Sequence, residues 1–210
     1  MTALFLSAFV TFFVVIDPAG CAPIFAGLTR AGDALHRRTM AIRSTLIAGA
    51  VLLLFAFVGQ PLLRALGISL DAFRAAGGIM LFLIALEMVF ERRTQRREDR
   101  AEEVSRQQAD EPDEPLDVSV FPMAIPMIAG PGSIATVMLM TAHAHGGDLL
   151  VVLVALLLVL TLVMASLLAA GPIMRVLGIK LEAMITRILG VLLAALAAQF
   201  VIDGVKGSFA

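Results

Sequence analysis

The chain has 210 residues, of which 60% are hydrophobic and only 16% are charged. Soluble domains average about 45–50% apolar and about 25% charged residues, so this composition excludes an ordinary water-soluble globule. A net charge of −1 provides no overall field that would attract nucleic acid. The single cysteine, Cys21, excludes an intrachain disulfide and a paired-cysteine metal site.

Six apolar stretches are long enough to cross a bilayer, which takes about 20 residues. In chain order they cover 3–28, 41–59, 72–90, 118–141, 149–169 and 183–202. Surface helices of a soluble bundle would show a polar face, and these segments show almost none. We therefore predict an all-α integral membrane protein with six transmembrane helices.

A charged run, 91–117, divides the chain into two hydrophobic parts, 1–90 and 118–210. The run holds six of the 16 basic residues and ten of the 17 acidic ones, together with two prolines. It has too few apolar residues to fold alone, so we interpret it as a partly disordered loop. Three predicted spans lie on each side of it.

Basic residues fall mainly on one side of the predicted membrane. The loops after the first, third and fifth spans hold twelve of them, whereas the opposite side holds Arg64, Arg74 and Lys206. Loops rich in Lys and Arg stay in the cytoplasm. We therefore expect the 91–117 loop to be cytoplasmic and both termini to be periplasmic, in a bacterial inner membrane.

The two hydrophobic parts contain an internal repeat. Residues 61–73, PLLRALGISLDAF, and residues 172–184, PIMRVLGIKLEAM, are identical at seven of 13 positions. A shift of one residue more pairs Gly78 with Gly190 and Ala85 with Ala197. Because each copy holds three spans, the second copy must enter the membrane from the opposite side, which predicts the inverted repeat that is typical of secondary transporters. Asp71 and Glu182 are expected in the first turns of the third and sixth spans.

The first and fourth spans each contain a proline–glycine motif, DPAG at 17–20 and GPGS at 130–133. Proline removes a helical hydrogen bond, and broken helices in membranes line polar cavities or pack in protein. We expect the helices to restart around Gly20 and Ser133, with Ser133 as an N-cap. The new N-termini would attract a carboxylate, and bare carbonyls near Ile16 and Ile128 would suit an ammonium group or a cation.

Asp17 is the most informative polar residue, because an acid near the bilayer centre is costly and usually functional. It could carry a proton, bind sodium or pair with a substrate amine, or it could only cap backbone N–H groups at the break. Ser133 and Thr136 could supply hydroxyls to the site or only core hydrogen bonds. The residues that we expect to bind substrate or ion are Asp17, Pro18, Ala19, Gly20, Pro23, Gly130, Pro131, Gly132, Ser133 and Thr136.

Together the two breaks predict a carrier for a small zwitterion, because their lining is small and needs no long charged side chain. We expect no cofactor or metal beyond a coupling ion, proton or sodium; partners would be the small amino acid substrate and the lipid bilayer. The oligomeric state stays open. Two alternatives are a small-solute exporter or channel and an intramembrane hydrolase that uses Ser133 with His143 or His145.

Three segments resemble the MarC family of bacterial inner-membrane proteins: IDPAGCAPIFAGLT (16–29), FPMAIPMIAGPGSIATV (121–137) and the pair LGIS and AGGI (66–69 and 76–79). The likeness covers nearly the whole chain outside 91–117. It implies six spans in two inverted repeats, and it implies SnatA-type, ion-coupled transport of glycine, alanine and similar amino acids, with a relation to the LysE superfamily. In the family pattern, the position of Asp17 accepts Asn as well as Asp.

Overall fold

The computed structural model describes residues 1–90, 117–142 and 144–209, and for 173–183 it describes only the backbone. Every regular element in these ranges is helical, which confirms the predicted all-α class. The elements are α1 (Thr2–Ile16), α2 (Pro18–Leu28), α3 (Ala34–Ala65), α4 (Leu70–Val89), η1 (Ser119–Ile128), α6 (Pro131–Ala142), α7 (Gly147–Leu168) and α8 (Ala170–Ser208).

The described helices supply five to six candidate membrane spans. Five stretches are long and apolar enough to cross a bilayer alone, namely Thr2–Leu28, Ala34–Ala65, Leu70–Val89, Gly147–Leu168 and Met184–Ser208. The sixth is the pair η1 and α6, which is bent by 55° at its break. All six lie where the apolar stretches of the sequence place them. Residues 91–116 of the charged run lie outside the described residues.

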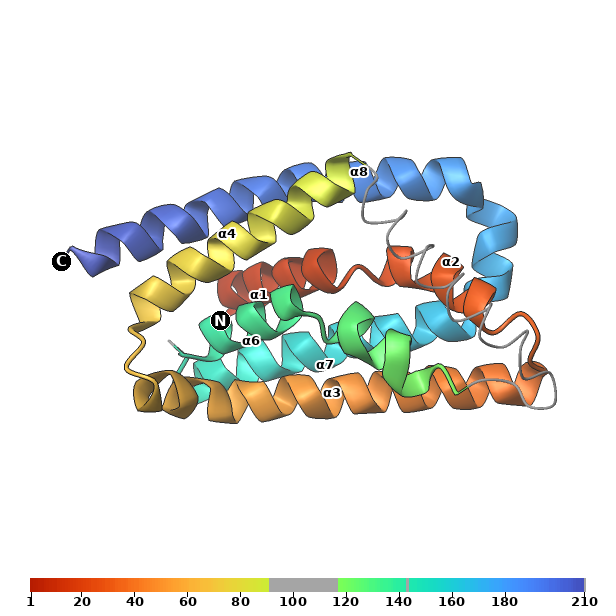
Figure 1. Ribbon diagram of the computed structural model, residues 1–210, viewed down its shortest axis with the longest axis horizontal. Coiled ribbons are helices and arrows are strands. Elements are labelled where there is room, and N and C mark those ends of the chain that lie inside the picture. Colours follow the sequence, from red (N-terminus) through yellow and green to blue (C-terminus); the bar gives the residue numbers. More distant parts are fainter. Residues whose placement is uncertain (91–116, 143, 210) are drawn as a thin grey trace.

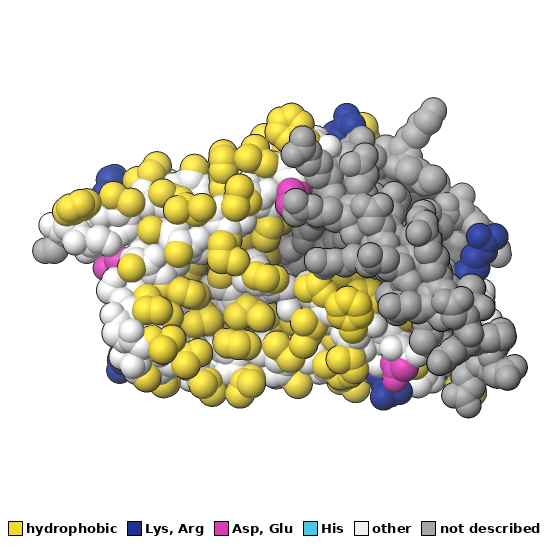
Figure 2. Space-filling view, in the orientation of Figure 1, with side chains coloured by type: hydrophobic (Ala, Val, Ile, Leu, Met, Phe, Trp, Pro, Cys, Tyr) yellow, Lys and Arg dark blue, Asp and Glu magenta, His cyan; other side chains and the backbone are white. Residues whose placement is uncertain are grey.

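The outer surface of the bundle is apolar. Figure 2 shows a face covered by hydrophobic side chains, with few charged ones among them. Large residues such as Leu46, Leu83 and Val191 are more than half exposed. Contiguous apolar patches of this extent are unfavourable in water but suit the hydrocarbon of a bilayer. The surface therefore supports an integral membrane protein as strongly as the composition does.

Successive spans run in opposite directions along the long axis (Figure 1). The chain starts in α1 and ends in α8 toward the same end of the bundle, as six spans require. The pair η1–α6 runs against the direction of the pair α1–α2. The two interrupted spans are therefore antiparallel to one another.

Packing partners are exchanged between the two parts of the chain. The first interrupted span, α1 with α2, packs on α7, and the second, η1 with α6, packs on α3. Likewise α2 packs against α8, and α6 packs against α4. The helices α4 and α8 form the most extensive pair and lie side by side along much of their length (Figure 1).

Glycines allow α4 and α8 to approach at backbone distance. A Cβ on Gly78 would lie 2.8 Å from the carbonyl oxygen of Ala197, and a Cβ on Gly190 would lie 3.1 Å from that of Ala85. Small residues at helix interfaces permit such contacts. The pairing is reciprocal, because Gly78 corresponds to Gly190 in the repeat and Ala85 corresponds to Ala197.

The repeated motif folds differently in its two copies. In the first, Gly67 adopts a left-handed conformation with φ 69° and ends α3, and the hydroxyl of Ser69 accepts from Ala72 N at 3.1 Å to begin α4. In the second, α8 is helical from Ala170 onward, so Glu182 does not lie in a first helical turn as expected. Lys180 replaces Ser69, and lysine cannot accept the capping hydrogen bond and favours a helix.

Gly78→Ala should loosen the α4–α8 pair. Its Cβ would approach backbone atoms of α8 that cannot move independently, so we expect unfolding free energy to fall by about 1–3 kcal/mol. The matched control is Gly27→Ala, because nothing lies within 4 Å of that Cβ. Thermal melts of the purified variants measure the difference. Equal melting temperatures for the two variants would show that the contact between α4 and α8 is not tightly packed.

Candidate functional site

Asp17 forms the first break. Helix α1 ends at Ile16 and α2 begins at Pro18, while Asp17 between them adopts a left-handed conformation with φ 60° and ψ 69°. Its Oδ1 accepts a hydrogen bond from Gly20 N at 3.0 Å. Aspartate tolerates the left-handed region better than most residues, and Pro18 suits the first helical position because it has no N–H to satisfy. Helix α2 therefore begins two residues earlier than the expected restart at Gly20.

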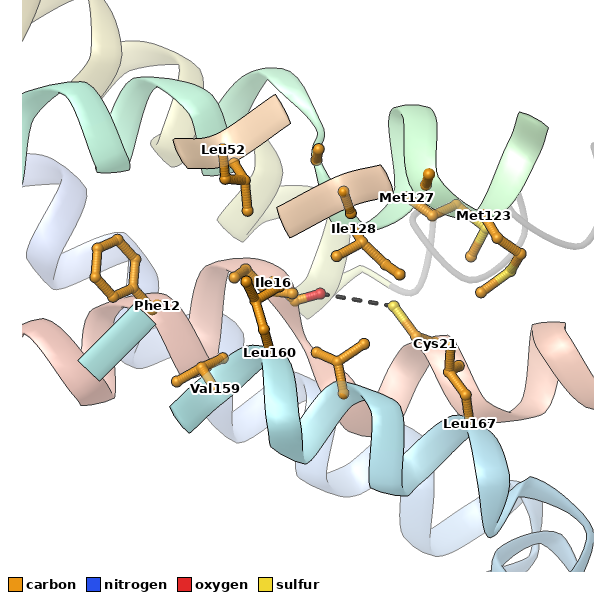
Figure 3. Close-up of a cluster of buried hydrophobic side chains, with 14 of the residues drawn as sticks. Phe12, Ile16, Cys21, Leu52, Met123, Met127, Ile128, Val159, Leu160 and Leu167 are labelled. Atoms are coloured by element: carbon orange, nitrogen blue, oxygen red, sulfur yellow. Dashed lines mark hydrogen bonds between the residues drawn. The ribbon is translucent and has the colours of Figure 1, made fainter. Parts of the chain in front are cut away.

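The hydrogen bond from Gly20 N thus supports the capping interpretation of Asp17, while a role in ion binding stays a prediction. Asp17 is fully buried. The carbonyl of Ile16, which was expected to be bare, accepts a weak hydrogen bond from the Cys21 thiol at 3.7 Å (Figure 3). That expectation was wrong because α2 starts early enough to bring Cys21 back over the end of α1.

The segment before the second break is not an α-helix. The segment η1 has π-helical hydrogen bonding, with Ala129 N donating to Ala124 O at 2.9 Å. Phe121 and Ile125 have extended backbone angles, and the peptide bonds that follow them are cis. The half-helix expected before the break in the fourth span is therefore π-helical and irregular rather than α-helical. Pro122 and Pro126 lack N–H donors, so an α-helical ladder cannot pass through them, and this spacing was visible in the sequence.

Helix α6 begins at Pro131, so the prediction of Ser133 as an N-cap was wrong. Gly130 precedes the helix, and its carbonyl accepts from Ile134 N at 3.0 Å. A Cβ on Gly130 would lie 2.5 Å from the carbonyl oxygen of Pro126, so a residue with a side chain would not fit at this position without a backbone shift. The hydroxyl of Thr136 donates to Gly132 O at 2.8 Å, so the structure shows the core hydrogen bond for this residue.

The two breaks meet in the interior. A Cβ on Gly132 would lie 2.6 Å from Ile84 Cδ1 and 3.6 Å from Val15 Cγ1, so the start of α6 packs directly on the end of α1 and on α4. Ile16 and Ile128, the last residues of α1 and η1, belong to one buried cluster (Figure 3). The structure therefore brings together the two motifs that the sequence singled out.

Burial differs among the residues expected in the site. Ala19 and Pro23 are half-buried, and Pro131 is exposed. The others are buried: Asp17, Pro18, Gly20, Gly130, Gly132, Ser133 and Thr136. Three cavities between the described helices are lined by other residues. In this conformation the breaks are held together by packing, and the predicted substrate pocket stays a prediction.

Ser133 and His145 lie toward opposite ends of α6. Ser133 lies in the first turn of α6, and His145 comes three residues after Ala142, the last residue of that helix. At about 1.5 Å rise per residue, the helix separates them by well over 10 Å. His143 lies outside the described residues.

An ion pair fixes the start of η1 and was not expected from the sequence. Arg43 of α3 contacts Asp117 at 2.8 Å, and Asp117 also accepts from Ser119 N at 2.9 Å and from the Ser119 hydroxyl. The Ser119 hydroxyl, together with the Arg43 guanidinium, lowers the pKa of Asp117 below its ordinary value. Asp117, the last residue of the charged run, is therefore tied to both α3 and the start of η1. The D-x-S spacing was the available signal.

Asp17→Asn should fold nearly as well as the wild type, because asparagine keeps the oxygen that accepts from Gly20 N and tolerates a left-handed backbone. Asp17→Ala loses the cap and places alanine at φ 60°, so we expect a loss of about 1–3 kcal/mol. Thermal melts of both variants test this. If Asn is as damaging as Ala, the negative charge rather than the cap stabilises the break.

Comparison with known proteins identifies the family. The sequence model described as "MarC family integral membrane protein" matches residues 2–209. A UPF0056 membrane protein of Methanocaldococcus jannaschii is 35% identical over 97% of both chains. The UPF0056 membrane protein YvbG of Bacillus subtilis is 31% identical over the whole of this chain and 97% of its own. No solved structure matches. The chain therefore belongs to the MarC family of integral membrane proteins, as its proline–glycine motifs predicted.

Proposed function

We propose that this protein is a secondary transporter of small neutral amino acids such as glycine and alanine, working by alternating access. The observation that carries the proposal is the pair of interrupted spans, whose breaks pack against one another inside the bundle. Irregular backbone at membrane depth is tolerated where protein buries it or a polar cavity adjoins it. Paired interrupted helices are a recurrent way to build a transporter site.

An inverted repeat would explain the packing. If 1–90 and 118–210 are related by a two-fold axis in the membrane plane, then α1–α2 corresponds to η1–α6, α3 to α7 and α4 to α8. The observed packing of α1–α2 on α7 and of η1–α6 on α3 follows this exchange. The reciprocal contacts of Gly78 with Ala197 and of Gly190 with Ala85 follow it as well. Rocking of one repeat against the other would then expose the breaks to each side in turn.

The termini of the half-helices match the chemistry of a zwitterion. The N-terminal ends of α2 and α6 carry partial positive charge and would attract the substrate carboxylate. The Asp17 carboxylate and the carbonyl end of η1 would favour the ammonium group or a cation. Ala19 and Gly132 are small, so a rearrangement that separates the breaks would admit a glycine- or alanine-sized molecule. We propose that Asp17 couples transport to a proton or sodium gradient in addition to capping α2.

Flux assays in proteoliposomes test the substrate. Labelled glycine and alanine should accumulate under an imposed proton or sodium gradient, and the matching ionophore should abolish the accumulation. If no small neutral amino acid moves in a gradient-dependent manner, the substrate proposal is wrong. In Asp17→Asn the gradient should no longer stimulate transport, while the protein stays folded. Unchanged ion dependence in that variant would remove Asp17 from the coupling step without excluding transport.

We further propose that the protein lies in the bacterial inner membrane with both termini periplasmic. The basic residues near the start of α3 are at the opposite end of the bundle from Lys206 near the chain's end (Figure 1), which supports this orientation.

Cysteine labelling tests the orientation. In a Cys21→Ala background, Lys206→Cys should react with a membrane-impermeant maleimide in cells whose outer membrane has been opened. Arg30→Cys should react only after the inner membrane is disrupted. The background protein without cysteine is the control. The reverse pattern would invert the proposed topology.

A further inference from the structure

A cavity of about 350 Å³ lies away from the two breaks, where α2 and α7 end and α3 and α8 begin. It is bounded by the C-terminal end of α2, the first turns of α3 and the junction of α7 with α8. Its lining is Phe25, Ala26, Thr29, Ala34, Arg37, Arg38, Leu167, Leu168, Ala170, Gly171 and Pro172. This is the end of the bundle that carries the arginines in the first turns of α3.

The polar part of the lining is cationic. Arg37 and Arg38 are both exposed side chains, and Arg37 Nε donates to the carbonyl of Gly32 at 3.2 Å, which directs its guanidinium over the start of α3. No acidic residue contributes to the described lining. Among the described residues the ion pair of α3 is formed by Arg43, and neither Arg37 nor Arg38 has a carboxylate partner. Two adjacent guanidinium groups with no carboxylate beside them in the described part of the chain favour an anionic ligand.

The remaining wall is apolar. Phe25 and Leu167 are almost fully buried beneath it, whereas Leu168 is 49% exposed at its edge and continues the hydrocarbon-facing surface of α7. The cavity thus joins a basic rim to an apolar surface within one site. A free anion would leave the apolar wall in contact with water, and the ammonium group of a zwitterionic amino acid would meet two cationic side chains and no carboxylate in the described lining.

We propose that this cavity binds the headgroup of an anionic phospholipid. The phosphodiester oxygens accept hydrogen bonds from Arg37 and Arg38, because guanidinium groups bind phosphate in a planar, two-pronged manner. The acyl chains lie along Leu168 on the outside of α7. Basic pockets between helices at the cytoplasmic side are a recurrent form of lipid recognition. The proposal concerns lipid binding alone and does not depend on the transported substrate.

Lipid binding should stabilise the fold, because the cavity is bounded by both α2 and the α7–α8 junction. A ligand that binds only the folded state raises the melting temperature by mass action. A headgroup held by the arginines of α3 would therefore link the first interrupted span to the α7–α8 junction.

Thermal melts of the detergent-purified, full-length protein test the site with three additives: phosphatidylglycerol, phosphatidylcholine and inorganic phosphate. Phosphatidylglycerol should raise the melting temperature, and the other two should not. In Arg37→Gln/Arg38→Gln the increase should disappear, with apparent affinity roughly tenfold lower for each arginine removed. The matched control is Arg30→Gln/Arg64→Gln, which loses the same charge outside the cavity and should keep the increase.

Three outcomes would overturn the proposal. The first is an equal response of both double variants to phosphatidylglycerol, which would mean unspecific attraction by charge. The second is stabilisation by inorganic phosphate as strong as that by phosphatidylglycerol, which would assign the site to free phosphate. The third applies if the double variant unfolds: native mass spectrometry of Arg38→Gln alone should show loss of bound phosphatidylglycerol, and full retention would exclude the site.

Discussion

In the interior of a membrane protein, each backbone N–H and C=O group must find a partner within the protein, because hydrocarbon offers none. The two breaks of this chain satisfy that constraint in different ways. At the first, the side chain of Asp17 supplies the missing acceptor for Gly20 N, and the thiol of Cys21 covers the carbonyl of Ile16. At the second, Pro122 and Pro126 have no N–H groups to satisfy. Ala129 N donates to Ala124 O in a π-helical hydrogen bond, and the Gly130 carbonyl accepts from Ile134 N.

The remaining helices hold these two breaks against one another. The close packing of α4 on α8 is possible because glycines of each helix face alanines of the other. This pair supports the start of α6 through the contact of Ile84 with Gly132. On the other side, α3 and α7 pack on the interrupted spans that belong to the opposite part of the chain. Each part of the sequence thus supplies packing surface that the other part needs.

Much of the fold could be predicted from the sequence, because membrane spans depend on local apolar content, and the breaks depend on proline and glycine within such runs. The first copy of the motif ends α3 at Gly67, whereas the second copy continues as helix in α8, and the likeness of the two motifs concealed this difference. The π-helical segment was predictable in principle from the spacing of Pro122 and Pro126. The approach of Gly132 to Val15, by contrast, depends on how distant helices pack, and no local pattern encodes it.

The unequal construction of the two breaks determines where the bundle can flex. Pyrrolidine rings fix φ at three positions of the segment from Pro122 to Pro131, so that segment resists torsion. The joint at Asp17 is crossed by hydrogen bonds from Gly20 N to Asp17 Oδ1 and from Cys21 Sγ to Ile16 O. Asp17 itself can rotate about its N–Cα bond, which no ring closes. Bending of the interrupted spans would therefore concentrate at the break around Asp17, whereas the segment from Pro122 to Pro131 would move as a rigid unit.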